Sequence, residues 1–431
     1  MRSTPQELPG LHTVEHELEV PLDPARPDGP RLTVFAREVC RPRRRHDDLP
    51  WMLFLQGGPG FPAPRPSDAS GWIGRVTEEY RLLLLDQRGT GRSSPVTHET
   101  LASLEGARAQ ADHLAHFRAD AIVRDAEAFR RELLAPGERW TLLGQSFGGF
   151  CALHYLSAHP EALEAALITG GLPSLDAPVD GVYRRTFAKL AEKNAAYYRR
   201  YPRDVERARE IAALLDAGDV RLPCGDRLTR RRFQSIGIGH GSSAGFEALH
   251  HLLEAAFVDG PGGRTLAYAF LKGVESMTSY DTNPIYALLH EAIYMQGAAS
   301  GWSADRVRSE FPAFDDPEGP LLFTAEMIHP WMFEDWSVLR PLAPAAELLA
   351  AREDWPALYD PARLEANEVP VAAAVYHDDA YVPVDLSLDT ARRVGRLRAW
   401  VTSEYEHDGL RVDGPRILGR LLGLARGELA R

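Results

Sequence analysis

A single pentapeptide, GQSFG at residues 144–148, restricts the choice of fold more than any other part of this chain. It stands between the apolar run 140–143 and the apolar segment 147–158, which has helical spacing. The pattern fits G-x-S-x-G between a strand and a helix, the arrangement called a nucleophile elbow. Ser146 would sit in a tight, strained turn, and the N-terminus of the following helix would favour negative charge developing beside it. The alternative is an ordinary serine in a glycine-rich turn.

The segments around this turn predict an α/β fold with a mainly parallel sheet and helices on both of its faces. Continuous apolar runs that end in polar or glycine-rich turns are typical of strands buried on both faces. Such runs occur at residues 51–55, 81–85, 140–143, 165–168 and 371–376. Segments 12–20 and 32–39 alternate with a period near two, as antiparallel strands do. Helically spaced segments at 119–134 and 147–158 separate several of the runs, which indicates strand–helix–strand units.

The sequence pattern changes after residue 171 and predicts a helical insertion. Residues 175–339 show little strand signal, and segments 183–198, 204–217 and 245–256 have helical spacing. The α/β pattern then returns, with an expected helix at 384–394, a strand at 397–401 and a closing helix at 415–426. A chain of 431 residues is long enough for two units or for one large domain with an insertion. We therefore expect a first part of the core at 1–173, a helical cap at 174–340 and a second part of the core at 341–431.

Composition argues against several classes of function. The net charge of −12 argues against nucleic acid or an anionic membrane as the main partner. Three cysteines form no disulfide framework, and neither paired cysteines nor HExxH supplies metal-ligand spacing, so we expect no metal and no other cofactor. The N-terminus has no apolar run of signal-peptide length, and no window reaches the roughly 20 apolar residues of a membrane span. We expect a cytoplasmic protein, and the sequence predicts no oligomeric state.

An elbow serine needs an oxyanion hole, and two backbone N–H groups are candidates for it. One is the N–H of Phe147, the residue after the serine, and the other should come from a loop that follows an earlier strand. That loop is FLQGGPG at residues 54–60. Gly57 and Gly58 would let the backbone approach a substrate carbonyl with no side chain in the way, and we expect Gly58 to be the second donor. The alternative is a simple strand-ending turn.

The serine also needs a base, and the base needs an acid that orients it. In this kind of fold the chain order is serine, acid, histidine, with the histidine after the last strand. His407 follows that strand and is our candidate among fifteen histidines, with His329 and His377 as rivals. Asp378 and Asp379 both follow the strand at 371–376. We prefer Asp379, which begins the turn DAYVP, and Asp378 remains open.

A third motif, DQRGTGRS at residues 86–93, completes a family pattern. It lacks the spacing of a phosphate-binding loop, so we expect a tight loop beside the oxyanion loop, braced by Asp86, Arg88 and Arg92. Together with GGPG at 57–60 and GQSFGG at 144–149, it resembles the proline iminopeptidases, which are serine peptidases of the α/β-hydrolase fold. The length and the insertion resemble the larger bacterial members. One departure is Gln56, which stands where many members have histidine.

The resemblance implies that the substrate is a peptide with a free N-terminal proline and that the cap binds its amino group with carboxylates. Glu291, in HEAIY at 290–294, and Glu326, in FTAEM at 323–327, are the candidates. An unpaired buried ammonium would be costly, which agrees with this expectation. Tyr294 is a candidate wall of a proline-sized pocket. The alternatives are an esterase or amidase for a small apolar acyl group, and a non-catalytic binding protein of the same fold.

Overall fold

A nine-stranded sheet forms the centre of the computed structural model, which describes residues 1–278, 280 and 282–429. The strand order is β1-β2-β3-β5-β4-β6-β7-β10-β11. Neighbours pair antiparallel from β1 to β5 and parallel from β5 to β11, which confirms the predicted mainly parallel sheet. The strands are β1 Arg2–Leu8, β2 Leu11–Pro21, β3 Arg31–Cys40, β4 Trp51–Leu55, β5 Arg81–Leu85, β6 Trp140–Gln145, β7 Leu163–Thr169, β10 Val371–Tyr376 and β11 Leu397–Thr402.

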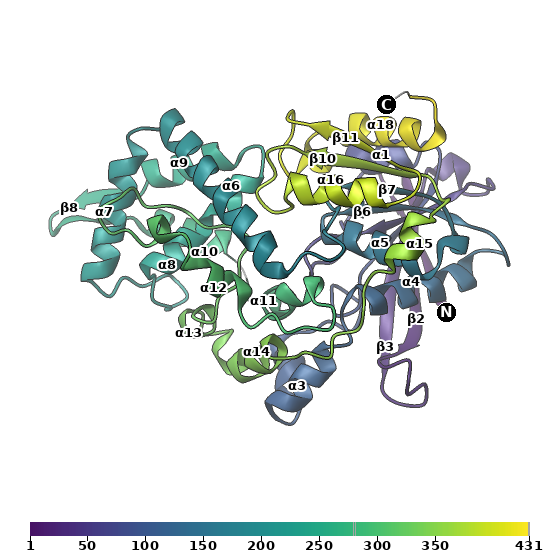
Figure 1. The fold of residues 1–431 in the computed structure, drawn as a ribbon, viewed down its shortest axis with the longest axis horizontal. Helices are drawn as coiled ribbons and strands as arrows, with labels where there is room; N and C mark the ends of the chain where they lie inside the picture. The colour runs from purple at the N-terminus through teal and green to yellow at the C-terminus, as the bar shows by residue number, and fades with distance from the viewer. Residues whose placement is uncertain (279, 281, 430–431) are drawn as a thin grey trace.

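The central strands consist mostly of apolar residues because both of their faces are covered. In β4, Leu53 and Leu55 pack into one hydrophobic cluster, while Met52 and Phe54 pack into another on the opposite face. Helices α1 (Gly71–Val76) and α18 (Gly414–Arg426) cover the second face, and α4 (Ala119–Leu133) and α5 (Phe147–Ala158) cover the first (Figure 1). Each fully buried leucine contributes about 1.5–3 kcal/mol to stability, so these runs strongly favour the doubly covered position.

A helical part between β7 and β10 lies beside the sheet (Figure 1). It has a separate hydrophobic cluster, which includes Tyr197, Phe233 and Phe323. Its helices are α6 Val179–Arg200, α7 Asp204–Ala217, α8 Arg230–Gln234, α9 Gly245–Glu254, α10 Tyr268–Met277, α11 Pro284–Leu289, α12 Ser303–Arg308 and α13 Met332–Asp335. Three further helices follow. Helix α14 (Ala343–Ala350) packs against α3 (Gly106–Leu114), α15 (Pro361–Glu365) packs against α5, and α16 (Val384–Arg393) packs against β10 and β11.

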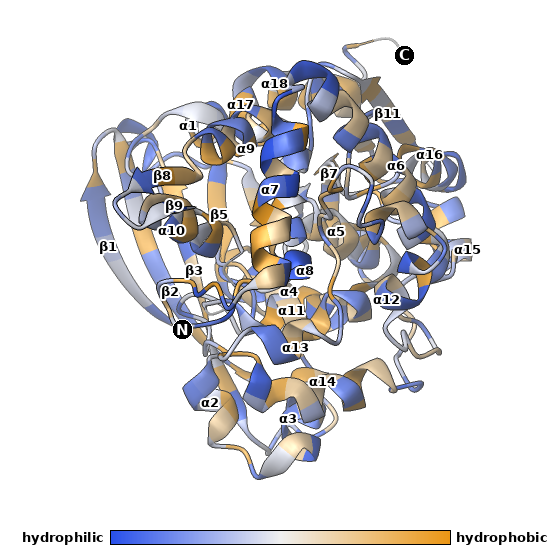
Figure 2. Ribbon diagram, turned by 90° about the vertical axis from the view of Figure 1, so that its left-hand side faces the viewer, coloured by the Kyte–Doolittle hydropathy of each residue, from blue (hydrophilic) through white to orange (hydrophobic). Residues whose placement is uncertain are grey.

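Two strand features were not predicted from the sequence. The edge strand β1 is exposed along almost its whole length and is mostly hydrophilic, so it lacks the alternation that marks a half-buried strand (Figure 2). The hairpin of β8 (Phe257–Gly260) and β9 (Gly263–Leu266) is likewise exposed and short. Both are held by backbone pairing and leave little trace in the pattern of side chains. In the described part of the chain, no helix combines the length and the apolar character needed to cross a membrane.

Candidate active site

Ser146 occupies the sharp turn between β6 and α5, as the elbow pattern predicts. Its backbone has φ +55° and ψ −126°, a conformation that is strained for any residue other than glycine. The flanking glycines are required by close backbone approach. A Cβ atom on Gly148 would lie 1.9 Å from the carbonyl oxygen of Leu55, and one on Gly144 would lie 2.4 Å from that of Gly148. The turn therefore places Ser146 directly after the end of β6 and directly before the first residue of α5.

His407 and Asp379 lie in contact. The Nδ1 atom of His407 is 2.7 Å from Oδ2 of Asp379. The other oxygen of Asp379 accepts the N–H groups of Tyr381 at 2.8 Å and Val382 at 3.1 Å, so the carboxylate is fixed from both sides. A proton on Nδ1, assigned from this partner, leaves Nε2 free to accept one. Asp378 has a different environment, because its carboxylate faces His377 at 3.1 Å and Lys189 at 3.8 Å.

The pKa of His407 reflects two opposing effects. Burial alone would lower it, but the charge and hydrogen bond of Asp379, with a further contribution from the charge of Glu326, raise it above the ordinary value for histidine. A base with a raised pKa accepts a proton more readily and holds it in a charged transition state. The arrangement can therefore withdraw a proton from a nearby hydroxyl and later return it.

Ser146, His407 and Glu326 all open onto one cavity of about 460 Å³. The core supplies the first two of these residues and the helical part supplies the third. Gly57 and Gly58 line the same cavity, together with the aromatic residues Phe61, Tyr280, Tyr286 and Tyr381. The described lining thus combines a candidate nucleophile, a base, a glycine-rich loop and one carboxylate.

The loop that carries Gly57 and Gly58 packs directly against the elbow. A Cβ atom on Gly57 would lie 2.8 Å from the Cβ atom of Ser146, so only glycine fits there. The side chain of Gln87 donates to the backbone carbonyl of Gln56 at 2.9 Å and holds the loop from behind. The backbone N–H of Phe147 begins α5 on the other side of the serine. Both expected oxyanion donors therefore belong to segments that meet at Ser146.

The loop at residues 86–93 is braced by ion pairs, as its sequence predicts. The carboxylate of Asp86 accepts two bonds from Arg65, at 2.7 and 2.5 Å, and one from the N–H of Ala63 at 3.1 Å. Arg88 forms a buried two-point pair with Asp125 at 2.7 and 2.6 Å. Since Ala63 follows the glycine-rich loop in the chain, the bond between Ala63 and Asp86 also holds the end of that loop in place.

Glu326 faces the cavity and interacts with an aromatic residue. The hydroxyl of Tyr286 donates to its Oε1 atom at 2.8 Å. Burial raises the pKa of Glu326 to about 7, against the opposing effects of charge on His407 and of the Tyr286 hydrogen bond. An approaching cation would favour the carboxylate form. This carboxylate is therefore suited to bind a positively charged group near Ser146.

Glu291 and Tyr294 lie elsewhere, which the resemblance did not lead us to expect. Glu291 is buried at the N-terminus of α12, where its carboxylate accepts the N–H groups of Ser303 at 3.2 Å and Ala304 at 2.9 Å. It does not belong to the described lining of the Ser146 cavity, so the expected amino-group contact does not fit this position. Tyr294 packs edge-on against Phe150, with ring centroids 5.5 Å apart, and lines a different cavity.

Several lining residues carried no usable signal in the sequence. Tyr286 and Tyr280 lie in the helical part, where an aromatic residue is more often in a core than in a site. Arg411 lines the cavity from the short helix α17 (Gly409–Val412), which the sequence analysis did not identify. Gln145 and Phe61 could have been found, because one is the variable residue before the elbow serine and the other directly follows GGPG.

Neither of the two rival histidines belongs to the described lining of the Ser146 cavity. His329 is buried and bonded to Asp305 at 3.0 Å, and His377 is exposed.

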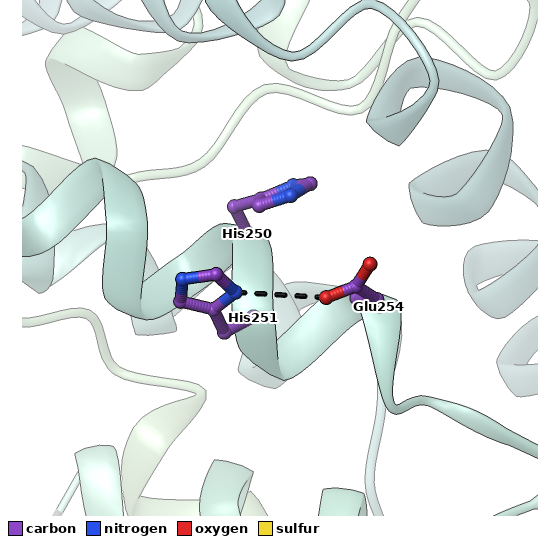
Figure 3. Close-up of side chains that lie close together, drawn as sticks. All are labelled: His250, His251 and Glu254. Atoms are coloured by element: carbon purple, nitrogen blue, oxygen red, sulfur yellow. Dashed lines mark ion pairs between the residues drawn. The ribbon is translucent and has the colours of Figure 1, made fainter.

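Among the described residues, one group could hold a metal ion: His250, His251 and Glu254 on α9 (Figure 3). His250 is already bonded to Asp204 at 2.8 Å, which leaves an exposed pair on the helix surface.

Comparison with known proteins gives consistent results. The profile of the alpha/beta hydrolase fold family matches residues 50–217. A protein named "Proline iminopeptidase" from Aeromonas sobria is 52% identical over 421 residues, which cover 97% of this chain and 98% of the relative. "Proline iminopeptidase aneH" from Aspergillus aculeatus is 39% identical over 426 residues, with 97% of this chain and 94% of the relative covered.

Proposed function

Because this chain belongs to the proline iminopeptidase family of α/β hydrolases, we propose that it releases N-terminal proline from peptides with Ser146 as nucleophile. His407 is the general base and Asp379 orients it. The observation that carries the proposal is that Ser146, His407 and Glu326 share one cavity. A nucleophile beside a carboxylate is the arrangement that a peptidase specific for a free N-terminus needs.

The reaction follows from the geometry in two halves. Ser146 Oγ attacks the carbonyl carbon of the N-terminal proline while Nε2 of His407 takes the hydroxyl proton. The oxyanion is held by the N–H groups of Phe147 and Gly58, which need no reorganisation during the reaction. His407 then donates the proton to the leaving nitrogen, and the shortened peptide departs. In the second half water, activated by His407, releases proline from the acyl-enzyme and restores the serine hydroxyl.

The selectivity of this proposal rests on Glu326. The carboxylate pairs with the secondary ammonium of proline, and Tyr286 orients the carboxylate through its hydroxyl. The rings of Phe61 and Tyr286 meet edge to face, with centroids 5.5 Å apart, and Tyr280 stacks on Tyr286 at 5.8 Å. These rings form an apolar wall for the pyrrolidine ring. A buried ion pair is favourable only when both charges are present, so a substrate with a blocked amino group should be rejected.

Residues 174–340 act in this proposal as a cap on the core. They supply Glu326, Tyr286 and Ile238 to the cavity lining, while residues before and after them supply Ser146 and His407. The cap thus recognises the substrate's N-terminus and the core performs the chemistry. Cys40, Cys151 and Cys224 are free thiols, as is common in reducing compartments, which supports action in the cytoplasm.

A panel of chromogenic substrates tests the proposal. Prolyl, alanyl and N-acetylprolyl anilides are compared with a neutral acyl ester, and Ser146→Ala serves as control. We expect kcat/KM to be highest for the prolyl anilide and to fall sharply when the amino group is acetylated. Ser146→Ala should abolish both activities and labelling by a serine-directed phosphonate. Preference for the acetylated substrate would contradict the proposal.

A further inference from the structure

The loop that carries His407 is bound to the helical part at three consecutive residues. Lys193 of α6 contacts both carboxylate oxygens of Glu406, each at 2.6 Å. The backbone N–H of His407 donates to the carbonyl oxygen of Gly241 at 3.0 Å. Ser243 donates to the carboxylate of Asp408 from its N–H at 3.1 Å and from its hydroxyl at 2.7 Å. The base is therefore held from the cap side as well as by Asp379.

The loop of the acid is tied to the same cap segment. Tyr381, two residues after Asp379, donates its hydroxyl to the carbonyl oxygen of Ile238 in the 3₁₀ helix Ser235–Gly241. The ring of Tyr381 also stands edge-on to the ring of His407, with centroids 4.9 Å apart. A Cβ atom on Gly241 would lie 2.0 Å from this tyrosine ring, so the contact is close. One short cap segment thus touches the loops of both Asp379 and His407.

Lys193 is unusual among these contacts because it is a buried cation. Its exposed fraction is 7%, and it reaches across from α6 to a loop more than 200 positions later in the chain. Burial also raises the pKa of Glu406, against the charge and hydrogen bonds of Lys193. Lys193 is buried and Glu406 is partly exposed, and an ion pair of this kind is a weak source of stability. Its two contacts nevertheless hold Glu406, and with it the loop of His407, against α6. This pair is therefore better suited to position the His407 loop than to stabilise the fold.

We propose that Lys193 and Glu406 are positioning residues, and that this ion pair lets the cap hold the His407 loop in the geometry that catalysis requires. The base is then competent only when α6 is seated against the core. The inference rests on the proposed function only through the role of His407 as base, not through the identity of the substrate. Displacement of a catalytic group by about 1 Å can cost on the order of 100-fold in rate, so loss of the pair should appear in kcat.

Four variants test the pair. Lys193→Met removes the charge and keeps the length, Lys193→Arg keeps the charge, and Glu406→Gln removes the partner's charge. The double variant Lys193→Met with Glu406→Gln removes both charges. Arg184→Met is the matched control, because Arg184 lies on the same helix and pairs with Glu310 at 2.7 Å inside the cap.

For Lys193→Met we expect kcat to fall about 10- to 100-fold for both a prolyl anilide and a neutral ester, with KM changed less than about threefold. Lys193→Arg should recover most of the activity, and Arg184→Met should resemble the parent enzyme.

The double variant separates positioning from stability. If the pair only stabilised the fold, removing both charges would restore activity together with melting temperature, because no lone buried charge remains. We expect the melting temperature to recover while kcat stays low. Recovery of both, or an unchanged kcat in folded Lys193→Met, would overturn the inference. A loss confined to the prolyl anilide would also overturn it, since that result assigns Lys193 to substrate binding. Hydrolysis of the neutral ester depends on His407 but not on recognition of proline. If the proline assignment is wrong, the parent enzyme will therefore cleave the ester but cleave the prolyl anilide poorly.

Discussion

At the scale of single residues, the chemistry of the site depends on environment more than on residue type. Asp378 and Asp379 are adjacent and identical in kind, yet one is partly exposed beside His377 and the other is 4% exposed with both oxygens bonded. Likewise, Glu291 was the first candidate for the amino-group carboxylate in the sequence, and Glu326 was the second. In the structure Glu291 caps the N-terminus of α12, whereas Glu326 faces the Ser146 cavity.

The contrast between the two aspartates gives a first prediction. Asp379→Asn should lower kcat by about 10⁴-fold, because the amide cannot hold His407 in the required tautomer. Asp378→Asn should change kcat little, because the carboxylate of Asp378 contacts His377 and Lys189 rather than His407. Steady-state kinetics on a prolyl anilide measures both. A larger loss in Asp378→Asn would transfer the orienting role to that residue.

A second prediction concerns pH. In the proposed mechanism, binding of an amino group requires ionised Glu326, with a pKa of about 7, and catalysis requires neutral His407, with a pKa raised above its ordinary value. Both groups must lose a proton, so activity falls as pH decreases. For a prolyl anilide, log kcat/KM should fall with a slope approaching two, whereas a neutral ester should show a slope of one. Equal slopes would show that Glu326 takes no part in binding.

At the scale of elements, Glu291 links the helix α12 to the fold. The carboxylate of Glu291 accepts hydrogen bonds from two N–H groups at the start of α12. Its negative charge also interacts favourably with the positive end of the helix dipole. Glu291→Gln should lower the free energy of unfolding by about 1–3 kcal/mol, because the amide oxygen can accept only one of the two N–H groups and leaves the other unsatisfied. Urea denaturation measures this change. The values of kcat/KM for a prolyl anilide and a neutral ester should change by the same small factor, whereas a selective loss on the anilide with unchanged stability would make Glu291 an amino-group ligand after all.

The elements also show what a sequence can reveal and what it cannot. Residues 51–55 and 81–85 were predicted with the bounds that β4 and β5 have, because burial on both faces leaves an unbroken apolar run. Ser146 was placed correctly at its turn because close backbone packing there allows only glycine at positions 144 and 148, which leaves a recognisable pattern. The strand β1 left no such mark, since backbone pairing forms it. Glu326 lies in an irregular segment and Tyr286 lies on α11. Their contact depends on how the cap segments fold back over the core, which local patterns do not encode.

At the scale of the whole molecule, the cavity draws on two parts of the chain with different tasks. The sheet fixes Ser146, Asp379 and His407 at its end, and the cap brings Glu326 above them. The cap also contacts the His407 loop through Lys193 and Gly241. In the proposed mechanism, recognition of the substrate and alignment of the base therefore both depend on how the cap packs against the core.

The most direct test of this account is the selectivity of Glu326→Gln. The change removes a charge with little change of shape, and kcat/KM is measured above the acid limb for a prolyl anilide and for a neutral ester. Loss of one partner of a buried charge pair costs about 2–5 kcal/mol, or about 30- to 4,000-fold. We expect that loss on the anilide and almost none on the ester, with Glu291→Gln as the matched carboxylate control. Equal losses on both substrates, or no loss on either, would contradict recognition of the N-terminal amino group by Glu326.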